Sequence, residues 1–143
     1  MMAAAGLMPA WILQRGDLQA TIVTTDLQKK AQLEKDGWLL DDVGQLQADA
    51  VEGSGPLYRL LRGPERLLET DAAQLPVLER AGFEVEGIVG HAAASAGPGR
   101  VAVIQFAKGE QKIWVVKDAQ QKKAMQNGWS RMGVHFWLWP AAK

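Results

Sequence analysis

Asp36-Gly37-Trp38, Ala81-Gly82-Phe83 and Asn127-Gly128-Trp129 are three copies of one short pattern, a glycine followed by an aromatic residue. The first and second glycines are 45 residues apart, and the second and third are 46 apart. Self-similarity at a fixed spacing indicates one supersecondary unit that is used repeatedly. The predicted units are repeat 1 at residues 10–50, repeat 2 at residues 56–95 and repeat 3 at residues 101–142.

Each unit has the same predicted order, in which a β-hairpin is followed by a helix and a final strand. In the first unit, apolar strands at residues 11–15 and 20–24 flank a turn at Gly16. A helix then begins after Asp26, because a short acidic side chain can accept the free backbone N–H groups of the first turn. Gly37 ends this helix, since glycine reaches the left-handed C-cap conformation without a steric penalty. The corresponding caps in the other units are Asp71 and Asp118.

The predicted fold class is α+β, with three β-hairpin–helix–strand repeats, a period of about 45 residues and pseudo-threefold symmetry around one core. The 143 residues are expected to form a single domain over residues 1–143. The aromatic residue after each C-cap glycine should pack back on its helix. The predicted core comprises Leu13, Ile22, Leu33, Trp38, Leu60, Leu78, Phe83, Ile88, Phe106, Ile113, Met125, Trp129, Val134 and Phe136.

The composition excludes several kinds of chemistry. The chain has no cysteine, which excludes disulfides and thiol catalysis, and its two histidines do not have a metal-ligand spacing. It contains neither a P-loop nor a G-x-S-x-G motif. We therefore expect no enzymatic activity, no cofactor and no metal. No apolar run approaches the ~18 residues of a membrane span, and residues 1–9 lack the basic flank of a complete signal peptide.

Residues 56–92 resemble a bacterial repeat of unassigned function. The resemblance rests on Tyr58-Arg59 in the first strand, on Thr70-Asp71 before the helix, and on Gly82-Phe83 with Glu86-Gly87 in the last strand. It is partial in the other two units. Repeats of this kind are found in secreted or surface proteins, often in tandem and sometimes beside cell-wall hydrolases. The resemblance implies a secreted or cell-surface module that binds carbohydrate or cell wall without catalysis; the sequence itself is equally compatible with a cytoplasmic location.

The candidate ligand site is aromatic and lies in the third unit. The final strand alternates, so that Val134, Phe136 and Leu138 are predicted to share one face, and His135, Trp137 and Trp139 the other. Rigid aromatic faces stack on sugar rings and suit partner interfaces. The predicted ligand-binding residues are Trp137, Trp139, His135 and Trp114, and the predicted ligand is a glycan or cell-wall polymer.

The charge distribution leaves two other functions open. Residues 1–99 carry 8 basic and 14 acidic side chains, a net charge of −6, whereas residues 100–143 carry 8 basic and 2 acidic, a net charge of +6. This asymmetry could join copies head to tail, which is the alternative of a protein-interaction or assembly module. Nucleic-acid binding is the least favoured reading, because the chain as a whole is neutral. Its phosphate contacts would be Lys108, Lys112, Lys117, Lys122, Lys123 and Arg131.

Overall fold

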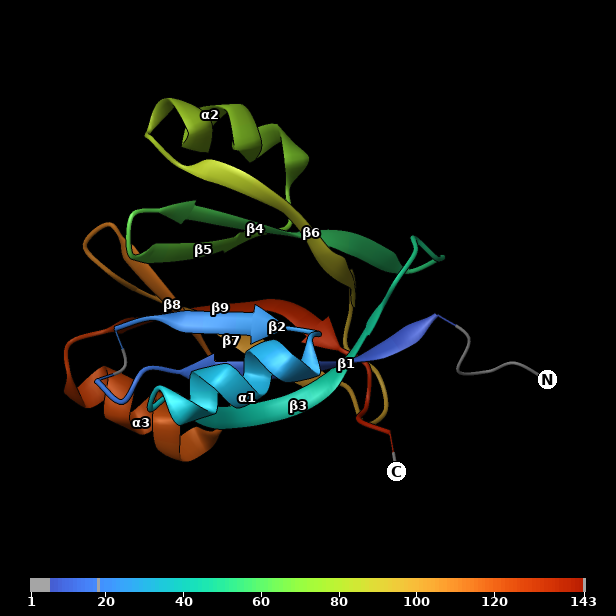
Figure 1. Cartoon of the computed structure of the whole chain (residues 1–143), viewed down its shortest axis with the longest axis horizontal. Coiled ribbons are helices and arrows are strands. Elements are labelled where there is room, and N and C mark those ends of the chain that lie inside the picture. Colours follow the sequence, from blue (N-terminus) through green and yellow to red (C-terminus); the bar gives the residue numbers. More distant parts are fainter. Residues whose placement is uncertain (1–5, 18, 143) are drawn as a thin grey trace.

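Strands make up most of the regular structure in the computed structural model, which describes residues 6–17 and 19–142 (Figure 1). The strands are β1 Leu7–Gln14, β2 Thr21–Thr24, β3 Leu39–Gln47, β4 Ser54–Arg62, β5 Glu65–Glu69, β6 Glu84–Ala93, β7 Val101–Lys108, β8 Gln111–Val115 and β9 Ser130–Leu138. The helices are α1 Leu27–Lys35, α2 Leu75–Arg80 and α3 Asp118–Gln126, with a short 3₁₀ turn η1 at Ala72–Gln74 before α2.

All nine strands belong to one hydrogen-bonded antiparallel sheet. Its main path runs β2-β1-β3-β6-β9-β7-β8, and β4 and β5 branch from β6. The ladders β1–β3, β4–β6 and β7–β9 are long, whereas β3, β6 and β9 meet one another through very short ones. Gln47 pairs with His91, Ala93 pairs with Trp137, and Gln45 pairs with Trp139. The sheet therefore has three three-stranded parts, β2-β1-β3, β5-β4-β6 and β8-β7-β9. They are joined where β3, β6 and β9 meet.

The predicted fold class was wrong. The protein is mostly β and its sheet folds over in a sandwich-like arrangement, instead of forming three α+β repeats around a common axis. The helices are too short and too polar to form a layer, since α1 buries only Leu33, α3 only Ala124, and α2 no side chain. No helix within the described ranges could cross a membrane.

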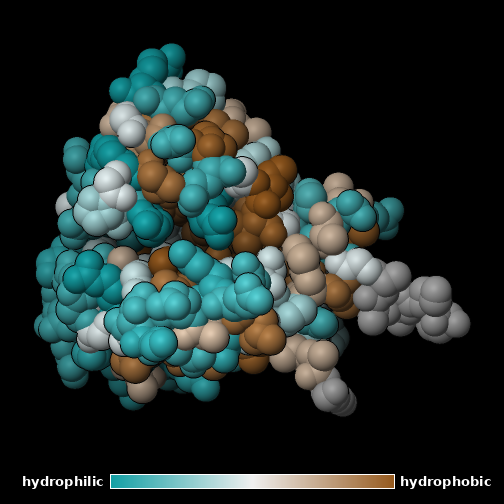
Figure 2. All heavy atoms as spheres, viewed as in Figure 1, coloured by the Kyte–Doolittle hydropathy of each residue, from teal (hydrophilic) through white to brown (hydrophobic). Residues whose placement is uncertain are grey.

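The core is also not a single symmetric one. The largest apolar cluster receives a buried side chain from each of the nine strands, including Leu57 from β4 and Trp114 from β8. A second cluster lies under α3 around Phe106 and Trp129, and a small third one packs Leu13 against Leu33 under α1. In the space-filling view, apolar side chains gather where the part built on β4–β6 meets the rest of the molecule (Figure 2).

The predicted helix ends are confirmed except at the starts of α2 and α3, since α2 begins at Leu75, after the turn that Asp71 caps. The Asp26 carboxylate accepts from the backbone N–H groups of Gln28 and Lys29, and Asp71 caps the turn before α2 in the same way. Gly37 has a φ of 97° after α1, and Trp38 N–H donates back to the helix across 2.9 Å. The ends of α2 and α3 show the same hydrogen-bond pattern. In contrast, Asp118 is the first residue of α3 and does not cap it.

Three predicted core residues are instead on the surface. Ile88 is 51% exposed, Met125 is 48% exposed and Val134 is 39% exposed. Met125 lies on the outer side of α3. Ile88 and Val134 each adjoin a β-bulge, because the register of β4–β6 shifts at Val89 and that of β7–β9 shifts at His135. A bulge puts two residues opposite one and so changes which side chains face the core. Trp38, Leu78 and Phe83 are half-buried, and the other predicted core residues are buried.

Gly44 lies at the meeting point of the long strands, where the backbone of β3 approaches β9 closely. A Cβ atom added at Gly44 would lie 2.6 Å from Leu138 Cβ and 2.9 Å from the backbone oxygen of Trp139. Contacts this short require a backbone to move, and Gly44 is flanked by the hydrogen bonds that link Gln45 to Trp139. The absence of a side chain at this position is therefore a condition for closing the sheet.

We predict that Gly44→Ala destabilises the domain by about 1–3 kcal/mol, the usual cost of overpacking a filled site. The matched control is Gly16→Ala, because a Cβ atom at Gly16 would meet no atom within 4 Å. Urea denaturation of the two variants measures the difference. Equal free energies of unfolding for both variants would show that the approach of β3 to β9 is not tight.

Candidate functional site

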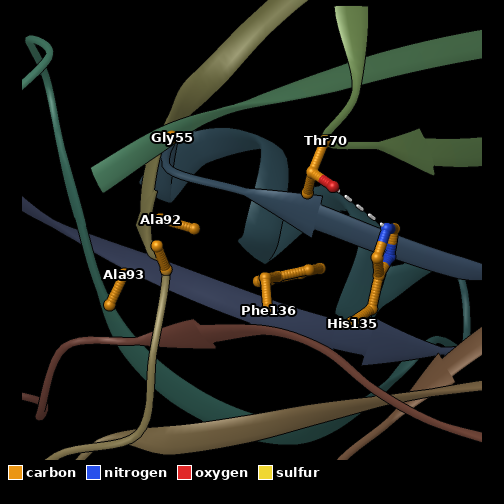
Figure 3. A pocket seen from close by; sticks show the side chains of 7 residues that line it. Gly55, Thr70, Ala92, Ala93, His135 and Phe136 are labelled. Carbon is orange, nitrogen blue, oxygen red and sulfur yellow. Dashed lines mark hydrogen bonds between the residues drawn. The ribbon is translucent and has the colours of Figure 1, made fainter. Parts of the chain in front are cut away.

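A pocket of about 250 Å³ opens where β4, β6 and β9 converge with the segment after β5 (Figure 3). Its volume approaches the lower end of the ~300–1,000 Å³ range of small-molecule sites. Small residues on one side of the pocket leave its volume unfilled, and polar and aromatic side chains line the opposite side. The lining residues are Gly55, Thr70, Ala92, Ala93, Ala94, His135 and Phe136.

A β-bulge in β9 brings two adjacent side chains to this pocket. Phe136 pairs with Val103 and Val134 pairs with Ile104, so His135 has no partner of its own on β7. In a regular strand His135 and Phe136 would point to opposite faces. The extra residue places both of them on the pocket side, where their rings make an edge-to-face contact with centroids 5.6 Å apart.

The imidazole of His135 is held in one tautomer. Trp114 Nε1–H donates to His135 Nδ1 across 2.8 Å, and the two rings lie edge to edge with their planes 28° apart. Because Nδ1 accepts this hydrogen bond, the proton of the neutral ring must be on Nε2. Nε2 lies 3.4 Å from Thr70 Oγ1, a long contact that joins β9 to the segment after β5 (Figure 3).

The surroundings favour the uncharged form of His135. Burial lowers its pKa from the ordinary 6.5, and the positive charge of Lys112 adds to this effect, while the carboxylate of Glu69 opposes it. Among the described residues that line the pocket there is no carboxylate and no other titratable group. The pocket therefore presents a neutral N–H donor, a hydroxyl and an aromatic ring.

The predicted site residues are not brought together on one face. His135 lines the pocket, and Trp114 is fully buried behind it. Trp137 and Trp139 are half-buried farther along the chain: Trp137 pairs with Ala93 of the pocket wall, and Trp139 has the Arg100 guanidinium 5.7 Å from its ring centre. The expected alternation fails at the bulge, because His135 and Phe136, which a regular strand would place on opposite faces, both line the pocket.

The sequence analysis did not identify Thr70, Phe136 or the small residues of the pocket as functional. Thr70 directly precedes the Asp71 cap, so the sequence pattern indicated only the start of a helix there. Ala92 and Ala93 end β6 and Ala94 follows it, and alanine side chains give no functional signal in the sequence. The described residues also contain no cluster of three His, Asp or Glu side chains that could hold a metal ion.

Residues 14–139 match the model of a protein family described as "Domain of unknown function (DUF5648)". The match covers most of the chain, and the protein therefore belongs to this family. No curated protein and no solved structure matches the sequence.

We predict that acidification destabilises the domain through His135. Its pKa is lower in the folded than in the unfolded protein, so the unfolded chain takes up the proton first as the pH falls. The free energy of unfolding should be greatest above pH 6.5, the ordinary histidine value, and decrease below it. A protonated ring also cannot accept from Trp114, a hydrogen bond worth about 1 kcal/mol.

Urea denaturation at a series of pH values measures this effect. In the His135→Gln variant, the decrease in the free energy of unfolding that begins near pH 6.5 should be absent. In the His91→Gln variant, this decrease should remain. If His135→Gln and the wild type lose stability in parallel, His135 does not titrate differently in the two states.

Proposed function

We propose that the domain is a non-catalytic binding module that takes one sugar unit of a glycan or cell-wall polymer in the pocket of Thr70 and His135. The observation that carries the proposal is the fixed neutral imidazole of His135, which presents Nε2–H beside a hydroxyl and an aromatic ring. A sugar offers hydroxyl oxygens to such donors and an apolar C–H face to an aromatic ring.

Several features support binding without catalysis. General acid–base chemistry needs a group that exchanges a proton near the working pH. The only titratable side chain among the described lining residues is His135, and its Nδ1 is engaged by Trp114. No carboxylate pair of the kind used in glycoside hydrolysis lines the pocket in the described part of the chain.

Trp137 extends the proposed site along the polymer. It pairs with Ala93, which forms part of the pocket wall, and it is half-buried. Trp114 acts through His135, since its own ring is fully buried. The resemblance of residues 56–92 to repeats of secreted and surface proteins agrees with a glycan ligand, and we include a secreted or cell-surface location in the proposal.

A second candidate function is protein interaction or self-association. It is favoured by large apolar side chains that remain exposed on β6 and β9, namely Ile88, Met132 and Val134. The opposite net charges of residues 1–99 and 100–143 add a possible attraction between copies. Light scattering at low salt and high protein concentration tests self-association, which a strictly monomeric species would refute.

We predict that Thr70→Val weakens sugar binding about three- to tenfold, because it removes one hydrogen bond from the pocket and keeps the side-chain shape. Binding is followed by tryptophan fluorescence with glucose, N-acetylglucosamine and soluble peptidoglycan fragments. The indole of Trp114 is hydrogen-bonded to His135, so its fluorescence should report an occupied pocket.

The matched control is Thr25→Val, since Thr25 precedes the Asp26 cap as Thr70 precedes Asp71 and does not line the pocket. Trp137→Ala tests the extended site separately. Saturable binding that Thr70→Val weakens and Thr25→Val does not would support the proposal. Flat titrations with every sugar, or equal losses in both threonine variants, would refute it.

A further inference from the structure

A second, smaller pocket lies between the β1–β2 hairpin and the β4–β5 hairpin, and most of its lining side chains are positively charged. It has a volume of about 80 Å³ and is lined by Ile22, Lys29, Arg59, Arg66 and Glu86. These residues come from β2, α1, β4, β5 and β6. The pocket shares no lining residue with that of Thr70 and His135, so what it binds does not depend on the proposed function.

The charges in this pocket are not balanced. Residues 1–99 carry only 8 basic side chains against 14 acidic ones, yet three of those 8 converge here with a single carboxylate. Glu86 lies 3.0 Å from Arg59 Nε. Within the part of the chain that the structure describes, no carboxylate pairs with Lys29 or Arg66. The pocket therefore has a net charge of +2.

The pairing of Arg59 is also incomplete. Arg59 Nε is close enough to Glu86 for an ion pair, but its N–H is not directed at the oxygen, and this buried nitrogen has no hydrogen-bond partner among the described residues. Arg59 Nη1 makes only a long contact of 3.5 Å with the Val23 carbonyl oxygen. The guanidinium of Arg59 is one-third exposed and has donors left over beyond its ion pair with Glu86, and the oxygens of a second anion would accept from them.

The position of Lys29 adds an independent indication. Lys29 lies in the first turn of α1, and that turn contains no acidic residue. The N-terminus of a helix carries partial positive charge, which adds to the charge of Lys29 at the edge of the pocket. Asp26 already uses its carboxylate to cap the backbone N–H groups of Gln28 and Lys29. The ammonium group of Lys29 is therefore available to a ligand in the pocket that this residue lines.

We infer that this pocket binds one phosphate group. Its volume suits a single oxyanion and is too small for a sugar ring or a nucleobase. The net charge of +2 matches a phosphate dianion, whereas a carboxylate would leave one charge unbalanced. The planar guanidinium groups of Arg59 and Arg66 present several donors to phosphate oxygens, and Lys29 adds a point charge. The phosphate is either free or the end group of a larger ligand.

The test is a titration of the ¹⁵N-labelled protein, followed through the backbone N–H of Lys29 and the side-chain Nε–H groups of Arg59 and Arg66. The probes are inorganic phosphate, methyl phosphate and acetate, with the ionic strength held constant by sodium chloride. We expect saturable shifts with phosphate and little response to acetate. Binding of methyl phosphate as tight as that of phosphate would show that the pocket admits a phosphate ester, and markedly weaker binding would favour the free ion.

Lys29→Gln should weaken phosphate binding about tenfold, because it removes one charge-assisted contact from an exposed helix position. Arg66→Gln should do the same, and it is the second variant because Arg66 also donates to the turn at Gly63. Lys35→Gln is the matched control, an exposed lysine at the other end of α1. The inference fails if no shift saturates, if acetate binds as tightly as phosphate, or if Lys35→Gln weakens binding as much as Lys29→Gln.

Discussion

The close approach of β3, β6 and β9 is the constraint on which the rest of the structure depends. These strands join the three-stranded parts of the sheet through only a few backbone pairs. The approach requires residues without side chains: a Cβ atom at Gly44 would collide with Leu138, and one at Gly90 would lie 2.9 Å from Leu46 Cβ. Every strand then contributes to the main apolar cluster. The pocket of Thr70 and His135 lies beside this junction, since Ala93 belongs both to its wall and to the pairing with Trp137.

A second set of interactions links this junction to the candidate site. A bulge in β3 turns Asp41 into the interior, where its carboxylate accepts from the backbone N–H groups of Val116 and Lys117. Thr21 exchanges hydrogen bonds with the backbone of Trp114. These contacts hold the end of β8 against β2 and β3, and thereby fix the backbone that carries Trp114. Trp114 in turn fixes the tautomer of His135, so the chemistry of the pocket depends on buried polar residues far away in the sequence.

The sequence predicted local structure better than the fold class. The glycines after the helices, and the Asp26 and Asp71 caps, act through contacts within a few residues, and the pattern identified them correctly. The fold class was wrong because helical periodicity does not show how little of each helix is buried. The predicted alternation in β9 holds for Phe136 and Leu138, which are both buried, and fails at Val134 and His135, because the bulge at His135 interrupts the regular strand. Thr70 and His135 are 65 residues apart in sequence, and only tertiary structure brings them together.

The most direct test of this account is a long-range ¹H–¹⁵N spectrum of the His135 ring at neutral pH, recorded with and without a sugar ligand. The account predicts a neutral ring with its proton on Nε2 and an unprotonated Nδ1 that accepts from Trp114. Addition of the ligand should move the Nε2 resonance and leave the tautomer unchanged. A charged imidazolium, or a proton on Nδ1, would contradict the central claim that Trp114 prepares His135 as a neutral donor in the pocket.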